Sequence, residues 1–306
     1  MGWFGGILGC AVNVVAVLLL APFLEGVARK LTARIQSRQG PPLRQPYYDL
    51  LKLLGKEDIE SGESPAMQRF AARLSLATVL AVGCLVPMGF GPPMGGAGDV
   101  ILLGYLLVLC GICTLLGGLA AGSTYSLMGM SREMMAMVAL EPLMAVALVV
   151  GAIHSGSLLL VDVLDGSVYG ATGFSISGVL MLGVMLLSFQ AFVGRVPFDI
   201  SEAETEIMEG PLMEYSGPKL ALFKYARMAK LVVYAGIFVG LFAPWGSSLG
   251  LPWAPVVFWA KVVVVVMAVT VVAATHARYR IDQLIRYFVG LLGVSLAAVA
   301  LASYGM

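Results

Sequence analysis

The chain has 306 residues, of which 59% are hydrophobic and only 12% are charged. A soluble domain carries about twice this density of charge, so the composition excludes an ordinary soluble enzyme and indicates a large lipid-facing surface. The 19 basic and 18 acidic residues leave a net charge of +1, and no nucleic-acid partner is expected.

Apolar segments recur along the whole chain, and eight of them have a length suited to crossing a bilayer. They predict an all-α polytopic membrane protein, folded as a single transmembrane domain over residues 1–306, with two structured cytoplasmic loops. The first segment has no basic residue before Arg29, so it is expected to remain as a helix and not to be cleaved as a signal peptide. The expected segments are 4–24, 74–90, 100–121, 134–153, 176–193, 220–245, 256–274 and 281–303.

Basic residues gather on alternate connections between these segments. The regions 25–73, 132, 195–230 and 278–286 hold 18 of the 19 Lys and Arg residues, and Lys261 is the exception. The connections 91–99, 154–175 and 246–254 contain no Lys or Arg. The positive-inside rule then predicts a protein of the cell (inner) membrane, with both termini outside and the large loops in the cytoplasm.

The first predicted cytoplasmic loop covers residues 25–73 and contains one amphipathic stretch. Tyr47, Leu50, Leu51 and Leu54 follow the i, i+3, i+4, i+7 spacing of an apolar helix face. Such a short helix suits the membrane interface, and packing on other protein is an equally good interpretation.

The second predicted cytoplasmic loop, residues 194–220, is strongly acidic. Ser201 and Glu204 have the spacing of a capping box and Gly210-Pro211 is a stop signal, so a short helix is expected between them. Glu204 should point away from the other acids of this helix. The acids expected to share one face are Asp199, Glu202, Glu206 and Glu209.

Carboxylates so close together repel one another, which raises their pKa values toward neutrality and suits them to taking up and releasing protons. The alternative is an acidic helix neutralised by structural ion pairs. The first loop offers basic partners uninterrupted by any acid, so the two loops are expected to dock charge against charge. These partners are Arg29, Lys30, Arg34, Arg38 and Arg44.

Charged residues also occur within the apolar segments. Glu141 lies in mid-segment before Pro142, where a carboxylate indicates either an ion path or a neutral, hydrogen-bonded structural group. Glu133 precedes it by eight residues and should lie on much the same side. Three bases at i, i+3, i+6 in the sixth segment either balance these acids or extend to the headgroups. They are Lys224, Arg227 and Lys230.

No metal site is predicted in this chain. Cys110 and Cys113 have the spacing of a metal or redox pair, but no second pair exists and the only histidines are His154 and His276. The cysteines are expected to be small apolar residues of helices. His154 is either an outer proton exit or an ordinary interfacial group.

Several motifs resemble one family of membrane proteins. Arg29-Lys30, the stretch from Arg34 through Gln36 to Arg38-Gln-Gly-Pro-Pro, and Tyr48-Asp49 are similar to the first cytoplasmic loop of that family. Pro197-Phe-Asp199-x-x-Glu202-Ala-Glu204-x-Glu206, followed by Glu214-Tyr215-Ser216-Gly217, resembles its second loop nearly letter for letter. The family comprises the H component of NADH:quinone oxidoreductase (called subunit 1 in mitochondria) and the matching components of energy-converting membrane [NiFe] hydrogenases. The resemblance covers most of the chain.

Within this family the chain is most similar to the hydrogenase branch, of the formate hydrogenlyase, CO-induced and Ech types. The similar motifs are Arg38-Gln-Gly-Pro-Pro, Ser131-Arg-Glu133, Leu140-Glu141-Pro142 and Glu209-Gly-Pro-Leu. Quinone enzymes of the family usually show Glu-Arg-Lys in the first loop, whereas here Ala28 precedes Arg29-Lys30. This departure argues against a quinone site.

The resemblance implies a function that composition does not reveal. The two loops would dock the hydrogenase large and small subunits and the iron-sulfur subunits, which carry the iron-sulfur clusters and the NiFe centre; no cofactor, metal or redox centre is expected in this chain. The docking residues of the first loop would be Arg29, Lys30, Arg34, Gln36, Arg38 and Asp49. Electron transfer would be sensed by the acids Asp199, Glu202, Glu204, Glu206, Glu209 and Glu214. Glu133, Glu141 and the bases Lys224, Arg227 and Lys230 would pass the effect to antiporter-like membrane subunits.

Three other functions remain open. The first is the quinone-site membrane component of NADH:quinone oxidoreductase, and the second is a passive anchor that only holds soluble subunits at the lipid bilayer. The third is a stand-alone transporter, which the lack of an inverted repeat and the long loops on one side only argue against.

Overall fold

The computed structural model describes residues 3–59, 64–89, 98–165, 167–169, 175–246, 250 and 253–305. Regular structure in these residues is helical, apart from one isolated bridge between Asp99 and Leu159. In the part of the chain that the structure describes, seven helices are long and apolar enough to span a membrane, and α7 (Ile176–Phe192) is a shorter apolar helix of 17 residues. The seven are α1 (Trp3–Ile35), α3 (Pro65–Leu85), α4 (Val100–Ala121), α5 (Thr124–Ser155), α9 (Gly217–Phe242), α10 (Trp253–Thr275) and α11 (Ile281–Ser303). The predicted all-α membrane fold is confirmed, with α7 as the shortest of the eight apolar helices.

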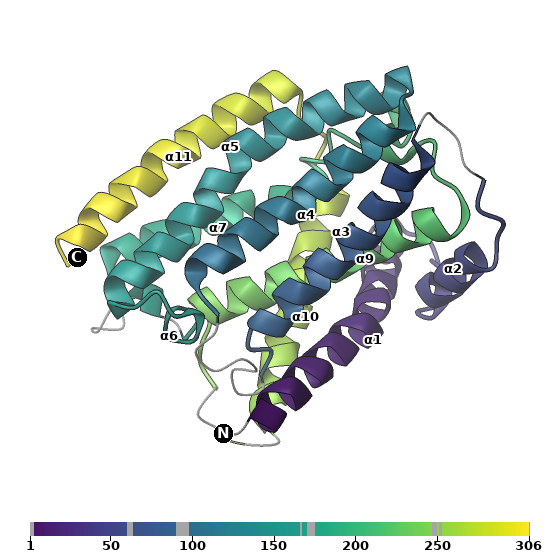
Figure 1. Cartoon of the computed structure of the whole chain (residues 1–306). Helices are drawn as coiled ribbons and strands as arrows, with labels where there is room; N and C mark the ends of the chain where they lie inside the picture. The colour runs from purple at the N-terminus through teal and green to yellow at the C-terminus, as the bar shows by residue number, and fades with distance from the viewer. Residues whose placement is uncertain are drawn as a thin grey trace.

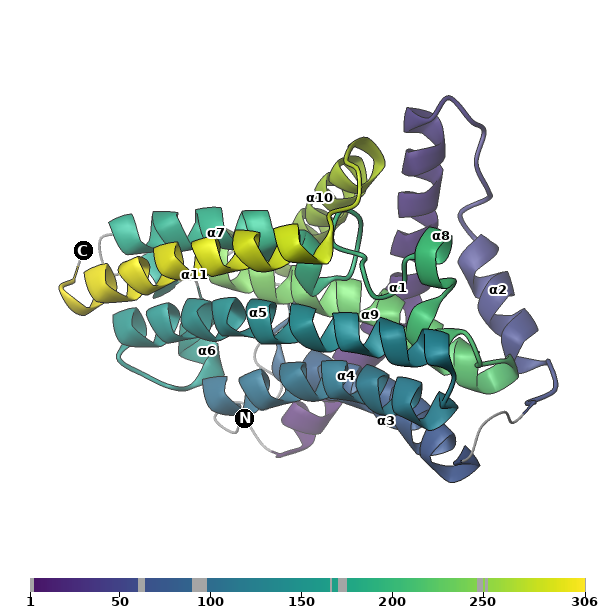
Figure 2. The same cartoon turned by 90° about the horizontal axis from the view of Figure 1, so that it is seen from above.

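The central helix of the bundle is α9. Every residue from Leu231 to Phe242 is buried, because α1, α3 and α10 pack around it. A helix that is apolar on all sides suits such a position. Around it, α3 packs against α4, and α5 against α11 (Figures 1 and 2). In contrast, only 22% of the span is buried in α10 and in α11, as expected of surfaces that face lipid or other membrane subunits.

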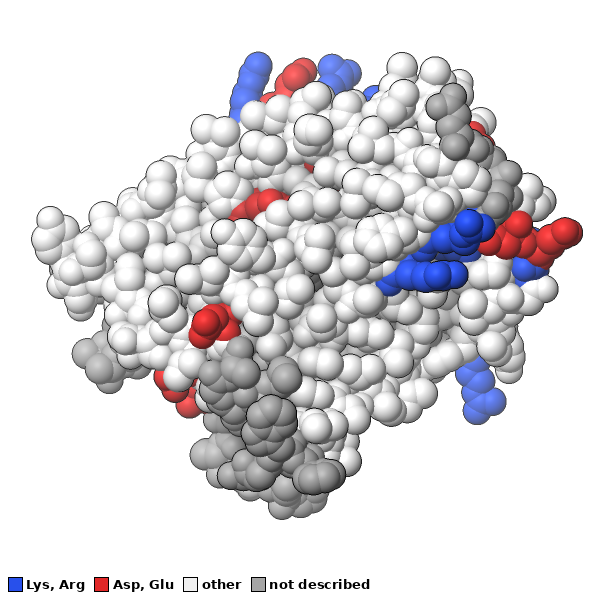
Figure 3. Space-filling model, viewed as in Figure 1, with Lys and Arg blue, Asp and Glu red and all other residues white. Residues whose placement is uncertain are grey.

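Charged groups are distributed unevenly over the molecule. On the face shown in Figure 3, Lys and Arg side chains lie toward the right-hand and upper edges, and most of the surface is uncharged. The right-hand side is the end of the molecule where α2 (Gln45–Leu54) lies (Figure 1). Both ends of the chain lie away from α2, which agrees with the two-sided distribution of charge in the sequence.

The predicted amphipathic helix is present as α2. Leu50 is buried, and the Tyr47 hydroxyl donates a hydrogen bond to the carbonyl oxygen of Leu19 in α1. Leu51 and Leu54 of the predicted apolar stripe are exposed instead, by 65% and 51%. The helix therefore uses only part of its apolar surface within this chain and leaves the rest available to lipid or a partner.

The single capped helix predicted for the second loop is wrong. The structure has a four-residue helix, α8 (Glu204–Ile207), and a separate 3₁₀ turn, η2 (Gly210–Leu212), and Ser201 caps neither. The loop folds back on itself, so that a Cβ on Gly210 would lie 2.0 Å from the carbonyl oxygen of Ser201. Gly210 has a positive φ of 53°, which glycine adopts at little cost. A continuous helix over 202–209 is incompatible with this turn.

Two further contacts hold the folded-back loop against the bundle. The Ser126 hydroxyl of α5 lies 3.4 Å from the Pro211 carbonyl oxygen of the loop and 2.8 Å from the Gly118 carbonyl oxygen of α4. The Tyr215 hydroxyl of the loop donates to the Gly117 carbonyl at 2.7 Å. Burial raises the pKa of Tyr215, so its hydroxyl stays protonated and able to donate. These contacts join the acidic loop to α4 and α5.

Candidate functional site

The acids of the second loop do not form the single predicted stripe, because they pair with bases from several parts of the fold. Arg227 of α9 forms an ion pair with Glu202, and its Nη2 lies 3.8 Å from an Asp199 oxygen. The other Asp199 oxygen lies 3.6 Å from Nη2 of Arg278, which follows α10. Asp199 and Glu202 are therefore held together by one shared guanidinium.

The outer acids pair at the surface. Glu206 lies 2.6 Å from Nη1 of Arg132 in α5, and Glu209 lies 3.8 Å from Nζ of Lys224 in α9. The carboxylates of both pairs are substantially exposed, so each pair contributes about 0–1 kcal/mol to stability. Attraction to three separate elements explains why the four carboxylates are spread out and not aligned on one helix.

Glu202 is the acid best suited to proton exchange among the loop residues. Burial raises its pKa above the usual value, and the negative charges of Asp199, Glu133 and Glu209 act in the same direction. The positive charge of Arg227 opposes this shift. The side chain of Glu204 lies outside the described residues, and Glu214 is partly buried near the end of the loop.

One important acid, Glu25, was not selected from the sequence. It is only 6% exposed in α1, where it pairs with Arg195 of the second loop and lies 3.3 Å from Nε of Arg29. Arg29 in turn lies 2.8 Å from Asp49 of α2, which also accepts a hydrogen bond from Gln45 at 3.0 Å. These five residues link the second loop, α1 and α2. The available signal was the i, i+4 spacing of Glu25 and Arg29 at the end of an apolar segment.

The predicted docking of first-loop bases on second-loop acids is wrong in its polarity. Four of the second-loop acids find basic partners in α5, in α9 and in the segment after α10 rather than in the first loop: Asp199, Glu202, Glu206 and Glu209. Instead, the acid Glu25 receives Arg195, and Asp58 lies 3.3 Å from Lys219 at the start of α9. Arg34, Gln36 and Arg38 are exposed at the end of α1, with Arg38 donating to Gln36.

Two neighbouring cavities lie between this loop and the helices of the membrane interior. The smaller, of about 70 Å³, lies beneath the loop and is lined by Asp199, Glu202 and Arg227, together with Glu133 and Lys230. The larger, of about 470 Å³, is also lined by Glu133 and Lys230 and lies between α4, α5, α7, α9 and α11. Both volumes exceed what one water molecule requires. Glu133 and Lys230 therefore stand where the two cavities meet.

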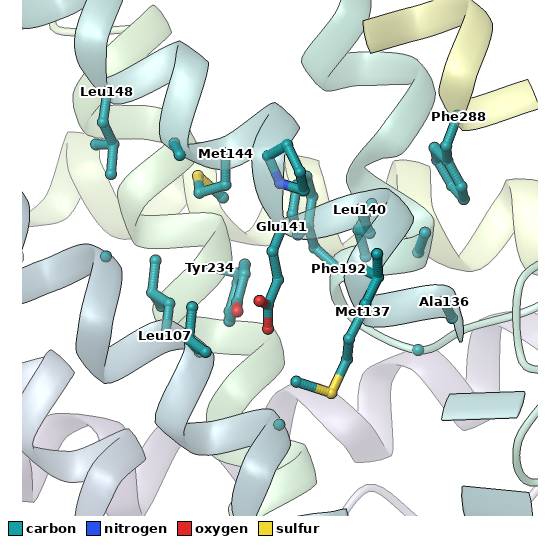
Figure 4. Close-up of a pocket in the computed structure, with 18 of the residues that line it drawn as sticks. Leu107, Ala136, Met137, Leu140, Glu141, Met144, Leu148, Phe192, Tyr234 and Phe288 are labelled. Atoms are coloured by element: carbon teal, nitrogen blue, oxygen red, sulfur yellow. The ribbon is translucent and has the colours of Figure 1, made fainter. Parts of the chain in front are cut away.

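The larger cavity is mostly apolar, and its polar groups are few. Glu141 and Tyr234 point into it beside Leu107 and Met137 (Figure 4). Lys230 forms no ion pair in the described part of the chain, and its ammonium lies 5.5 Å from the centre of the Tyr234 ring. The charges of Lys230 and Glu133 both act on Glu141. A carboxylate so placed meets a nearby cation and a cavity with space for water instead of bare hydrocarbon.

A sequence model of the NADH dehydrogenase family matches residues 8–303. The chain belongs to the NADH dehydrogenase family. Family relatives include "Hydrogenase-4 component C" of Escherichia coli (strain K12), which is 34% identical over 94% of this chain and 92% of the relative. "Formate hydrogenlyase subunit 4" of the same organism is 33% identical over 89% and 90%. The H component of NADH-quinone oxidoreductase from Anaplasma phagocytophilum (strain HZ) is 30% identical over 92% and 90%. The resemblance inferred from the loop motifs is thus confirmed.

The NADH dehydrogenase family fold also occurs in a solved archaeal complex. A chain in the "Structure of the membrane-bound sulfane sulfur reductase (MBS), an archaeal respiratory membrane complex" superposes with a TM-score of 0.87, over 98% of this chain and all of that one. Its sequence is 24% identical, so the likeness concerns the fold. Within the described ranges of the chain, no group of three or more His, Cys, Asp or Glu side chains is placed to hold a metal ion.

Proposed function

We propose that this chain is the ion-coupling membrane component of an energy-converting hydrogenase complex. In this role it links electron transfer in docked iron-sulfur and [NiFe] subunits to proton or sodium translocation through the membrane. The observation that carries the proposal is the pair of cavities that share Glu133 and Lys230 and join the loop acids to Glu141. A chain of titratable groups with space for water between them is what proton transfer requires.

The coupling step follows from electrostatics. Negative charge arriving above the second loop raises the pKa of Glu202 further, so that Glu202 takes up a proton. Its neutralisation weakens the hold on Arg227, whose positive charge then acts more strongly on the groups below. Each such change is felt most in the membrane interior, where the dielectric constant is low. The redox centres themselves belong to the partner subunits.

Sequence similarity favours the hydrogenase branch. The relatives named after hydrogenase-4 and formate hydrogenlyase are 34% and 33% identical, and those named as the H component of NADH-quinone oxidoreductase are 28% to 32% identical. The replacement of the quinone enzymes' first-loop glutamate by Ala28 points in the same direction. Within the proposal, both termini lie outside, and the exposed Arg34, Gln36 and Arg38 belong to the cytoplasmic docking surface.

The decisive experiment uses the native complex reconstituted in vesicles, with Glu141→Gln and Glu202→Gln as separate variants. We expect each variant to assemble and evolve H2 in the presence of an uncoupler, while ion uptake per H2 falls at least about fivefold, the lower end of typical coupling strengths. Asp162→Asn is the matched control, because Asp162 is exposed in α6 (Leu160–Val163) and lines neither cavity. Normal ion uptake in both glutamine variants would leave only the passive-anchor role.

The quinone-site alternative has a direct test in the same preparation. The alternative role is suggested by the relatives that are named as components of NADH-quinone oxidoreductase. Nickel in the purified complex with H2-linked activity supports the hydrogenase role. Bound quinone, absence of nickel and inhibition by quinone-site inhibitors would replace it.

A further inference from the structure

Two cysteines from different helices lie against each other at the end of the bundle away from the acidic loop. Cys10 is near the start of α1, and Cys84 is the next-to-last residue of α3. The sulfur of Cys10 lies 3.8 Å from the carbonyl oxygen of Cys84, and the two thiols also interact with each other. Both are free and partly exposed.

The neighbouring contacts fix this arrangement. Asn13, one helical turn after Cys10, donates from Nδ2 to the Val86 carbonyl at 3.0 Å and more distantly to the Gly83 carbonyl at 3.4 Å. Helix α3 ends at Leu85, so carbonyl groups of its last turn lack partners within the helix. The side chains of α1 supply these partners and thereby hold the two cysteines at a constant separation.

We propose that Cys10 and Cys84 form an intramolecular disulfide by exchange with a disulfide-bearing oxidant at the outer face of the membrane. One cysteine thiolate attacks a sulfur of the oxidant's disulfide, which forms a mixed disulfide and releases one oxidant thiol. The other cysteine thiolate then displaces the second oxidant thiol and closes the Cys10–Cys84 bond. The two cysteines lose two electrons and two protons, and the oxidant gains them as two thiols.

We place this disulfide at the outer face of the membrane because of the orientation given under the proposed function. The start of α1 and the end of α3 lie opposite the basic loops, so that orientation places them outside, where disulfides form and persist. The other two cysteines are less accessible to an oxidant than Cys10 and Cys84. Cys110 and Cys113 are buried, and Cys113 lies 4.0 Å from the Thr78 hydroxyl. The bond would tie α3 to the helix that carries Glu25 and Arg29.

The experiment counts the disulfide-bonded cysteines of this chain, with the full complex kept in the membrane of spheroplasts. Samples are treated with oxidised glutathione, which does not cross the membrane, or with diamide, which does. Free thiols are then blocked in denaturant, disulfides are reduced, and the released thiols are labelled with maleimide-polyethylene glycol. The variants are Cys10→Ser, Cys84→Ser and the control Cys110→Ser/Cys113→Ser.

We expect two labelled cysteines with oxidised glutathione in the wild type and in the control variant. In Cys10→Ser or Cys84→Ser we expect at most one, because the remaining cysteine can only keep a mixed disulfide with glutathione. No label in the wild type with either oxidant overturns the proposal, as do two labels in Cys10→Ser, which would mean that another pair of cysteines forms the bond. Label with diamide alone overturns the assignment to the outer face. The readout is a thiol count, so it is independent of whether the complex pumps ions.

Discussion

Glu202 has a raised pKa because burial disfavours its charged form more than Arg227 favours it. The folded protein therefore binds this proton more tightly than the unfolded chain, whose glutamate titrates near about pH 4.3. Stability from this group is present below that pH and is lost as the pH rises through the folded pKa. As the pH rises above about 4.3, we expect the melting temperature of the wild type to fall relative to that of Glu202→Gln, which does not titrate at this position. Melting curves between about pH 4 and pH 8 measure it, and a constant difference contradicts the assignment.

Glu25 is held between two guanidinium groups with almost no access to water. Glu25→Gln leaves Arg195 without its acid, whereas Arg29 keeps Asp49, and the partly exposed Arg195 can still reach water. We therefore expect a loss of about 1–3 kcal/mol in the free energy of unfolding. Removing Arg195 as well takes away the cation that Glu25→Gln leaves without its acid. The double variant Glu25→Gln/Arg195→Gln should therefore cost less than the sum of the single variants, by about 0.5–3 kcal/mol.

The exposed pair Arg132–Glu206 is the matched control for this cycle. Its coupling energy should lie within about 0–1 kcal/mol, because solvent screens both charges. Equal coupling in the two pairs, measured by unfolding in mixed micelles, would show that Glu25 is an ordinary surface acid.

Most acids of the candidate site could be selected from the sequence, but their partners could not. A carboxylate in an apolar segment, such as Glu141, is conspicuous on composition alone. The pairing of Asp199 with Arg278 joins positions 79 residues apart, and only the packed bundle brings them together. Glu25 escaped notice because its position at the end of an apolar segment is shared by many ordinary interfacial acids.

At the level of elements, hydropathy located the helices but not their ends. The first helix was expected to end at residue 24 and continues to Ile35, and the fourth was expected to begin at 134 and begins at Thr124. Residues 25–35 and 65–73, which were assigned to the first loop, are helical as well. A helix can continue beyond the bilayer once its side chains are charged, because its backbone hydrogen bonds do not depend on lipid. Hydropathy detects only the part that lies in hydrocarbon.

The single helix predicted for the second loop is wrong for a different reason. The capping-box spacing of Ser201 and Glu204 is a local signal, and tertiary ion pairs with α5 and α9 outweighed it. We expect Gly210→Ala to destabilise the protein by more than about 2 kcal/mol, because the new Cβ would lie 2.0 Å from the Ser201 carbonyl in addition to the cost of positive φ.

Gly194→Ala is the control for this substitution. Gly194 also has a positive φ, of 64°, but nothing lies within 4 Å of the position of a Cβ. It should cost only about 1 kcal/mol. Melting temperatures of the two purified variants test the prediction, and equal losses would mean that the fold-back at Ser201 is not formed.

For the whole molecule, Lys230 is a cation that lines both the cavity beneath the loop acids and the cavity of Glu141, and its charge acts on Glu141. A charge there acts across a medium of low dielectric constant, whereas Lys224, two turns earlier, pairs with Glu209 at the surface. We expect Lys230→Met to lower ion uptake per H2 by about tenfold or more, with assembly retained. Lys224→Met removes the same charge from the same helix and should change the ratio by no more than about twofold, since exposed pairs are weak. Vesicle assays of both variants decide the matter: equal ratios would place the ion path outside this chain, because a path through these cavities cannot treat the two lysines alike.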